Sequence, residues 1–314
     1  MSLEFAAVGF DPSHVQSEEP GNVLASEDHE KQSFKLSARV VAFCVTHKLH
    51  LAACSIGAAW AWSGLLHTGL RPWDAVVIAT TVLCVYQWNR LTDVSEDRLN
   101  CPLELESAIQ NSKSIRIFCL GTATLAVTLP MLTSQPGKGV VVGICLILGF
   151  LYGTPLLFGK RLKDIPVLKN LSSGFGWALL TVVYPSIRLS SWDFKVWLAF
   201  GYMFTAVVMV EMTWDIRDVI GDRGAGVRSI PVAFGIQTTE SLISSLNSLT
   251  GVLLVAFLLE GRLSNAWVLV LLNFGLMQMS SAIIKKHTEL RRPWSHTLIV
   301  LQSVLLFGLG VVAR

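Results

Sequence analysis

The stretch VWLAFGYMFTAVVMVEMTWDIRDVIGDR, residues 196–223, contains the two features that decide how this chain folds. Its first part, 196–214, is uncharged apart from one acid, and it has about the 20 mostly apolar residues that a helix needs to cross a bilayer. Four acids follow one another toward its end, at spacings of four, three and four residues: Glu211, Asp215, Asp218 and Asp222. This spacing predicts a membrane-spanning helix that ends in a row of carboxylates on one face.

Eight other long stretches are nearly free of charge, at 49–70, 73–89, 117–137, 139–159, 170–187, 241–259, 263–284 and 293–313. Over the 314 residues, 52% are hydrophobic and 15% are charged, whereas soluble domains carry about 25% charged residues. This composition argues against a soluble enzyme, a disordered scaffold and a disulfide-stapled secreted protein. The net charge of +3 is too small to indicate nucleic-acid binding. The sequence predicts an all-α, polytopic membrane protein with nine transmembrane helices.

Residues 1–36 are rich in acids and hold no long apolar run, which predicts a disordered cytosolic tail before one transmembrane catalytic domain, 37–314. Lys and Arg are retained on the cytoplasmic side of membrane proteins. With the N-terminus inside, nine spans put 19 of the 25 basic residues on the cytosolic side and 6 on the other. This orientation predicts that the acidic helix ends face the cytosol and that the C-terminus lies on the opposite side.

A related acidic pattern follows the second predicted span. Asn89, Asp93 and Asp97 are spaced by four and four residues, so on a continuous helix they share one face, and Glu96 falls off that face. The segment from Asp93, DVSEDR, matches DVIGDR from Asp218 at four of six positions. The match at equivalent span ends indicates an internal duplication, which is common in membrane transporters and enzymes.

Carboxylates gathered at two helix ends repel one another, so they need bound cations or raised pKa values. Oxygen ligands without His or Cys favour Mg²⁺ or Ca²⁺ over zinc. Because Mg²⁺ commonly binds one or two carboxylates together with substrate phosphates, two such helices could hold a diphosphate through bridging Mg²⁺ and promote C–O cleavage. The predicted metal ligands are Asn89, Asp93, Asp97, Asp215, Asp218 and Asp222.

Basic and aromatic side chains complete the predicted site. Several basic or amide side chains near the motifs and in the loop after 139–159 could contact phosphate oxygens. The retention of Lys and Arg on the cytoplasmic side of a membrane explains these charges equally well. The candidate side chains are Arg98, Lys160, Arg161, Lys169, Asn170, Arg223 and Arg228. Aromatic rings can shield a carbocation through cation–π contact. The candidate cavity or cation-stabilising residues are Tyr152, Trp88, Trp214 and Glu211.

At these residues the chain resembles the UbiA superfamily of intramembrane prenyltransferases, over about residues 40–314. That family carries NxxxDxxxD after its second helix and DxxxD after its sixth, which here are Asn89-x₃-Asp93-x₃-Asp97 and Asp218-x₃-Asp222. The run 222–231 is similar to the family's continuation DRxxGxxT-L/I-P, and the stretch 152–170 is also similar. The resemblance implies nine helices around a central cavity.

The resemblance also implies a mechanism. Two Mg²⁺ ions between the motifs would bind a prenyl diphosphate of C10 to C20 or longer, with Asp93, Asp97, Asp218 and Asp222 as the catalytic aspartates. Loss of diphosphate would leave an allylic cation with its tail in the apolar bundle. An aromatic or lipid acceptor would then attack this cation.

This sequence differs from the family's usual pattern at two places, and both differences bear on how an acceptor would be handled. Many members continue the first motif with Asn-Arg-Pro and a basic run, whereas here Asn100-Cys101-Pro102 is followed by Glu104 and Glu106. A Glu is common where this chain has Ile220. A UbiA-type terpene cyclase, in which the cation closes on itself, is therefore the alternative to a transferase. A cation transporter would also use intramembrane acids, but it would not explain two related motifs on one membrane side.

Overall fold

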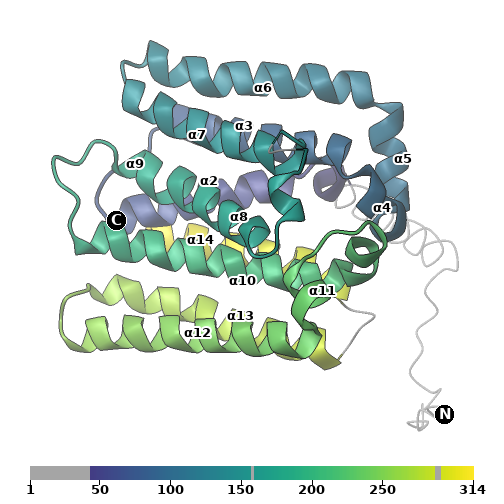
Figure 1. Cartoon of the computed structure of the whole chain (residues 1–314). Helices are drawn as coiled ribbons and strands as arrows, with labels where there is room; N and C mark the ends of the chain where they lie inside the picture. The colour runs from purple at the N-terminus through teal and green to yellow at the C-terminus, as the bar shows by residue number, and fades with distance from the viewer. Residues whose placement is uncertain (1–42, 157–158, 287–290) are drawn as a thin grey trace, which may run out of the picture. The chain divides into compact units, whose positions relative to one another are not determined.

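The computed structural model describes residues 43–156, 159–286 and 291–314, and within these ranges the chain is helical with no β-strand. The predicted tail, 1–36, lies outside the described residues. From Val45 to Arg314 the chain forms one compact unit. Figure 1 shows its long helices lying side by side, with three short helices at one end of the bundle: α4 (Val94–Asn100), α5 (Pro102–Gln110) and α11 (Ile230–Phe234).

The long helical segments of the described chain are α2 (Leu49–Leu65), α3 (Pro72–Thr92), α6 (Ser112–Leu132), α7 (Pro136–Gly153), α8 (Leu168–Ala178), α10 (Phe194–Gly224), α12 (Ile236–Leu259), α13 (Val270–Lys286) and α14 (Arg291–Val312). Helix α8 continues through a π-helical turn, η3 (Leu179–Val183), into α9 (Tyr184–Ser186). Two 3₁₀ turns, η2 (Leu162–Asp164) and η4 (Asn265–Leu269), precede α8 and α13.

Each predicted span overlaps one of these segments. Within the described ranges, six helices are long and apolar enough to cross a membrane: α6, α7, α10, α12, α13 together with η4, and α14. The predicted all-α, multi-pass class is therefore confirmed. We also predict that α2, α3 and the α8–α9 segment span the bilayer, and this part of the expectation stays a prediction.

Local sequence explains where several helices begin. Pro72 and Pro136 lie in the first turns of α3 and α7, where the missing N–H of proline costs no hydrogen bond. The side chain of Asp193 caps α10 by accepting hydrogen bonds from the backbone N–H groups two and three residues later. Helix α10 then runs without a break to Gly224, so its acids keep the single face that their spacing predicts.

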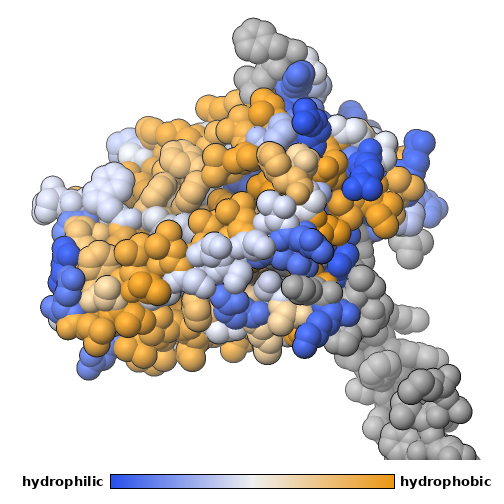
Figure 2. All heavy atoms as spheres, turned by 60° about the horizontal axis from the view of Figure 1, so that its bottom comes forward, coloured by the Kyte–Doolittle hydropathy of each residue, from blue (hydrophilic) through white to orange (hydrophobic). Residues whose placement is uncertain are grey.

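The bundle buries polar groups inside and exposes apolar side chains outside. Helix α2 packs against α3 and α14, and α10 packs against α8 and α12. Large apolar side chains on the outer helices are 61–84% exposed, among them Leu120, Leu132, Ile147, Val252, Leu259 and Val304. Figure 2 shows one face of the molecule, on which apolar residues predominate and hydrophilic residues gather toward the two ends. This distribution is expected for helices that face lipid.

A buried charged cluster joins three segments at the start of α3. Lys138 and Asp74 are each 1% exposed, and the ammonium of Lys138 lies 2.8 Å from a carboxylate oxygen of Asp74. The hydroxyl of Tyr184 donates to the same oxygen at 3.0 Å, and Lys138 lies over the Tyr184 ring. The cluster therefore ties α3, α7 and α9 together.

A second polar link joins α4 to α10. The amide of Asn100 donates to the backbone carbonyl of Asp218 at 3.3 Å and accepts from the backbone N–H of Gly221 at 3.2 Å. A Cβ at Gly221 would lie 2.3 Å from the Asn100 amide, so only glycine permits this approach. The link fixes the segment after the first acidic motif against the helix that carries the second.

Lys138→Met should lower the stability of the bundle, because it leaves the Asp74 carboxylate buried without its partner, at a cost of about 3–5 kcal/mol. Glu260→Gln is the control, because its pair with Arg262 is about half exposed and such pairs contribute ~0–1 kcal/mol. Thermal unfolding in detergent micelles measures both. The double variant Asp74→Asn/Lys138→Met should be more stable than Lys138→Met alone. Equal melting temperatures for Lys138→Met and Glu260→Gln would contradict this account.

Gly221→Ala should also destabilise the protein, because the new methyl group displaces Asn100. Gly201→Ala on the same helix is the matched control, since nothing lies within 4 Å of its added Cβ. Alanine is favoured over glycine within a helix by about 1 kcal/mol, so the control should be neutral or stabilising. Melting temperatures of the two variants in micelles decide the matter. If both shift equally, the close contact between α4 and α10 is not present.

Candidate active site

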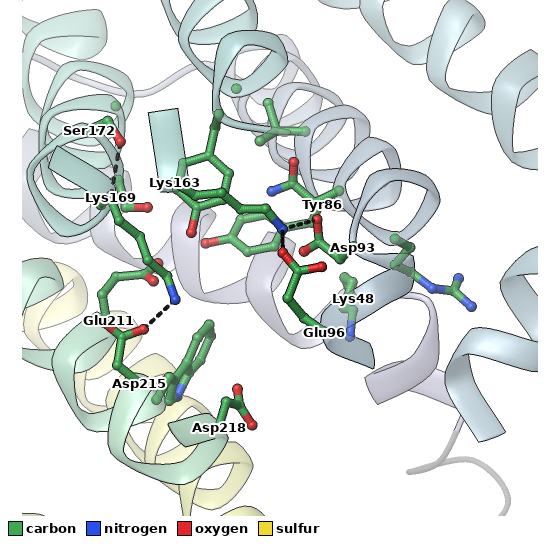
Figure 3. A pocket seen from close by; sticks show the side chains of 18 of the residues that line it. Lys48, Tyr86, Asp93, Glu96, Lys163, Lys169, Ser172, Glu211, Asp215 and Asp218 are labelled. Atoms are coloured by element: carbon green, nitrogen blue, oxygen red, sulfur yellow. Dashed lines mark hydrogen bonds and ion pairs between the residues drawn. The ribbon is translucent and has the colours of Figure 1, made fainter. Parts of the chain in front are cut away.

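A cavity of about 230 Å³ lies among α3, α4, α5, α7, α8 and α10, and Lys48, just before α2, also lines it. Both acidic motifs line it. Figure 3 shows Asp93 and Glu96 on one side and Glu211, Asp215 and Asp218 on the other. The structure thus brings together two segments that are more than 100 residues apart in the sequence.

The first motif does not lie on one continuous helix, as its spacing had suggested. Helix α3 ends at Thr92 and α4 begins at Val94, so Asp93 stands at the junction. Asn89, Asp93 and Asp97 nevertheless all line the cavity.

The break also turns Glu96 toward the cavity, so the expectation that Glu96 falls off the acidic face is wrong. Glu96 is 5% exposed, and its carboxylate lies 2.7 Å from the ammonium of Lys163 and 2.9 Å from the guanidinium of Arg161.

The two carboxyl groups of α4 differ in how far neighbouring positive charges and hydrogen bonds offset the cost of their burial. Burial disfavours the charged form of Glu96, but Lys163, Ser95 and Arg161 outweigh burial and lower the pKa of Glu96 to about 2. Burial and then the charge of Asp93 raise the pKa of Asp97 to about 7. Asp97 thus lies where a further positive charge would be stabilised.

The second motif lies entirely on α10, and Glu211, Asp215, Asp218 and Asp222 all line the cavity. Arg217 makes a close ion pair with Asp218 and donates to the hydroxyl of Ser295 at 2.9 Å. The Arg217 side chain therefore holds Asp218 and also connects α10 to α14.

Two lysines near the start of α8 reach the acids. The ammonium of Lys163 lies 2.6 Å from Asp93, and that of Lys169 lies 2.6 Å from Asp215 and 3.2 Å from Asp222 (Figure 3). The completely buried Asn170 donates to the other oxygen of Asp215 at 2.8 Å. Asn170 is not part of the cavity wall, so it orients Asp215 rather than facing a ligand.

The cavity has a donor set that fits Mg²⁺. Eight carboxyl groups and five basic side chains line it, which gives a formal net charge of −3. The side-chain oxygen of Asn89 is buried, and no described residue hydrogen-bonds to it. The described residues contain no preassembled group of three acidic, His or Cys ligands. Carboxylate and amide oxygens, such as those of the cavity wall, are the ligands that Mg²⁺ prefers.

The inner part of the cavity is apolar and aromatic. Tyr86, Trp177, Glu211 and Trp214 line both this cavity and a second one of about 60 Å³. The second cavity is lined mainly by apolar side chains of α2, α10 and α14 and by η4 and α13. Tyr152 also lines the first cavity. A ligand with a charged head and an apolar tail would find matching surroundings along this path.

Seven of the candidate residues named from the sequence are not part of the cavity wall: Asn170, described above, and six others. Four of them are exposed side chains: Arg98, Lys160, Arg223 and Arg228. Arg161 lies behind Glu96, where it pairs with that residue and with Asp164. Trp88 points to the other side of α3, where its indole donates to Thr154 and packs against Phe150.

Other lining residues were not selected from the sequence, namely Lys48, Tyr86, Arg90, Lys163 and Arg217. Lys163 lies in the basic loop after 139–159, but in the sequence nothing distinguishes this lysine from its basic neighbours, such as the exposed Lys160. Arg90 and Arg217 lie one residue after Asn89 and one before Asp218, and a helical pattern puts such neighbours about 100° away. Only the packing of several helices brings them to the same cavity.

Comparison with known proteins agrees with this architecture. The model of the UbiA prenyltransferase family matches residues 50–304. A UbiA homologue from Archaeoglobus fulgidus, solved with GPP and Mg²⁺, superposes with a TM-score of 0.69 at 16% identity, covering 86% of this chain and 98% of that one. The apo UbiA homologue from Aeropyrum pernix K1 gives a TM-score of 0.62 at 18% identity, over 82% and 96% of the two chains. These likenesses concern the fold.

Two curated relatives match about half of this chain. The 2-acyl-4-prenylphloroglucinol 6-prenyltransferase of Humulus lupulus is 26% identical over 170 residues, which are 52% of this chain and 41% of the relative. The digeranylgeranylglyceryl phosphate synthase of Korarchaeum cryptofilum is 27% identical over 158 residues, or 49% and 56% of the two chains. The matched segments thus span about half the length of these relatives. Because the family model covers most of the chain, this protein, an integral multi-pass membrane protein, belongs to the UbiA prenyltransferase family.

Proposed function

We propose that this protein is a Mg²⁺-dependent enzyme that ionises a prenyl diphosphate within the membrane and transfers the prenyl group to an acceptor. One observation carries the proposal: two sets of aspartates, from α3–α4 and from α10, line the same cavity, which continues into an apolar one. The GPP and Mg²⁺ bound to the Archaeoglobus homologue support this use of the fold.

In this proposal the diphosphate lies between the two acidic groups. Asn89, Asp93 and Asp97 on one side and Asp215, Asp218 and Asp222 on the other would hold two Mg²⁺ ions. When bound, Mg²⁺ neutralises the charge that develops on the departing diphosphate. The ammonium groups of Lys163 and Lys169 already lie among these carboxylates, within reach of phosphate oxygens placed there.

The reaction breaks the bond between the first prenyl carbon and the diphosphate oxygen, and the electron pair leaves with the diphosphate. The acceptor supplies the pair for the new bond to that carbon and loses one proton, which passes to water or to the released diphosphate. Tyr86, Trp177 and Trp214 line the inner cavity and would shield the cation from water. The printed names of the relatives, which concern a phloroglucinol and a glyceryl phosphate, support an aromatic or a lipid acceptor here.

The same aromatic lining also suits a terpene cyclase, which would fold the cation onto its own double bonds. Product analysis without added acceptor distinguishes the two activities. A cyclic hydrocarbon or terpene alcohol would identify a cyclase, whereas slow release of a linear prenol would identify a transferase that awaits its acceptor.

We further propose that the site faces the cytosol. Lys160, Arg161, Lys163 and Lys169 precede or begin α8 at this end of the bundle, and basic loops are retained on the cytoplasmic side. A charged diphosphate could then enter from water while its tail enters from the apolar interior.

Asp93→Asn and Asp218→Asn should each slow Mg²⁺-dependent diphosphate release by about 100-fold or more, because each removes a charge from the leaving-group site. Glu106→Gln, an exposed acid of α5, should leave the rate unchanged. Direct quantification of the released diphosphate, with purified protein and geranyl diphosphate, measures all three. EDTA should stop the wild-type reaction and excess Mg²⁺ should restore it. A full rate for Asp218→Asn would refute the assignment.

Leu309→Ala should shift the preference toward longer prenyl chains, because Leu309 lines the second cavity and is 3% exposed. The ratio of kcat/KM for a C20 over a C10 diphosphate should rise about tenfold, as expected for a change in apolar pocket size. Leu301→Ala, on the exposed face of the same helix, is the control. If both variants keep the wild-type ratio, the tail does not occupy the second cavity.

A further inference from the structure

Three polar side chains meet in the otherwise mainly apolar wall of the second cavity. They are Tyr202 of α10, Asn273 of α13 and Gln302 of α14, and Gln302 is 7% exposed. Polar side chains inside a membrane bundle commonly link helices through hydrogen bonds. A link of this kind uses only the atoms that bond between helices, so a polar atom left over in the cavity wall requires a separate explanation.

A backbone carbonyl sets the direction of the hydrogen bonds in this group. The carbonyl of Val270 can only accept, so the Tyr202 hydroxyl donates its proton to it at 3.3 Å. The Tyr202 oxygen then accepts from the side-chain nitrogen of Asn273 at 3.0 Å, and Oδ1 of Asn273 accepts from Nε2 of Gln302 at 3.0 Å. Nε2 of Gln302 also lies 3.6 Å from the sulfur of Met277, which is another acceptor. The nitrogen of Gln302 is thus satisfied, and its oxygen, Oε1, stands at the end of the chain.

The side-chain oxygen of Gln302 is left without a donor. No residue within the described ranges hydrogen-bonds to it. Unlike the unpaired oxygen of Asn89, it is not closed off by surrounding atoms, and because Gln302 lines the second cavity, it is open to that cavity. Covering an amide oxygen with an apolar chain costs free energy, whereas a hydrogen-bond donor placed there satisfies it. The oxygen therefore favours a ligand group that carries an O–H or N–H.

Gln302 lies along the apolar path and not among the aspartates. Ser295, on the same helix, accepts a hydrogen bond from Arg217 beside Asp218. Gln302 follows two helical turns later, about 10 Å farther along α14. In the proposed function this depth belongs to the prenyl tail. Because the lining here is mainly apolar, an uncharged donor such as an O–H group is buried at lower cost than a cation.

We propose that Gln302, positioned by Asn273 and Tyr202, is a binding site for an O–H group in the wall of the second cavity. The inference rests on the proposed function and concerns the isoprenoid tail. The O–H group belongs either to an oxygenated isoprenoid or to a water molecule that stays beside an ordinary tail. A water needs about 10–15 Å³ and two to four polar partners. The second cavity, of about 60 Å³, is large enough, and the oxygens of Asn273 and Tyr202 each keep capacity for one more hydrogen bond.

Binding of two non-reactive analogues tests the proposal. They are geranyl thiolodiphosphate and its 8-hydroxy derivative, which differ by one hydroxyl near the far end of the tail. Titration calorimetry with Mg²⁺ in micelles gives both dissociation constants for the wild type and for Gln302→Met, which keeps the length of the side chain but removes the amide. Their ratio should shift about tenfold toward the plain analogue in Gln302→Met, as expected for the loss of one hydrogen bond. Gln237→Met, at an exposed glutamine of α12, is the matched control and should keep the wild-type ratio.

The wild-type affinities identify the source of the O–H group. Tighter binding of the hydroxylated analogue indicates an oxygenated isoprenoid. Equal affinities, together with an ordered water about 3 Å from the Gln302 oxygen in a high-resolution structure, indicate water.

An unchanged ratio in Gln302→Met would overturn the proposal. If Gln302→Met does not fold, the wild-type structure decides, because the proposal fails when no oxygen atom lies within hydrogen-bond distance of the amide oxygen, with or without the geranyl analogue. If the wild type binds neither analogue in the presence of Mg²⁺, the proposed function fails, and the ligand-free structure still tests the O–H site on its own.

Discussion

A charge that is buried in an apolar helix bundle must be compensated, and the polar structure of this protein depends on that requirement. The bundle places eight carboxyl groups around one cavity, and most of them form ion pairs with basic side chains from other segments of the chain. Lys163 and Lys169 connect the α8 region to α4 and α10 in this way. Compensation is incomplete at Asp97, where burial and the charge of Asp93 raise the pKa to about 7, and the buried side-chain oxygen of Asn89 accepts no hydrogen bond from the described residues.

The geometry of the cavity follows from how two related motifs are built into different backbones. The second motif stays on one unbroken helix, so four acids form a straight row along α10. The first motif breaks at Asp93, and the break lets α4 turn so that Glu96 and Asp97 both face the cavity. Asn100 then fixes the end of α4 to α10 by bonding to the backbone beside Asp218 and Gly221. These contacts between α4 and α10 help to hold the two motifs at a set separation.

The sequence was sufficient for the elements that follow a regular pattern. Apolar stretches predicted the helices, and the spacing of Glu211, Asp215, Asp218 and Asp222 predicted their common face. It was not sufficient where long-range packing decides the outcome. Lys160 and Lys163 are equally basic and three residues apart, yet one is exposed and the other is 4% exposed beside Asp93. The helix break at Asp93 and the ion pair between Asp74 and Lys138 likewise depend on neighbours that are distant in the sequence.

The central claim is that the two acidic groups hold one prenyl diphosphate between them. The most direct measurement is a high-resolution structure of the protein with Mg²⁺ and a non-reactive geranyl thiolodiphosphate. The account predicts metal and diphosphate density between Asp93 and Asp97 on one side and Asp215, Asp218 and Asp222 on the other, with the geranyl chain toward Trp177 and Trp214. A diphosphate bound away from either group of aspartates, or bound without metal, would contradict it.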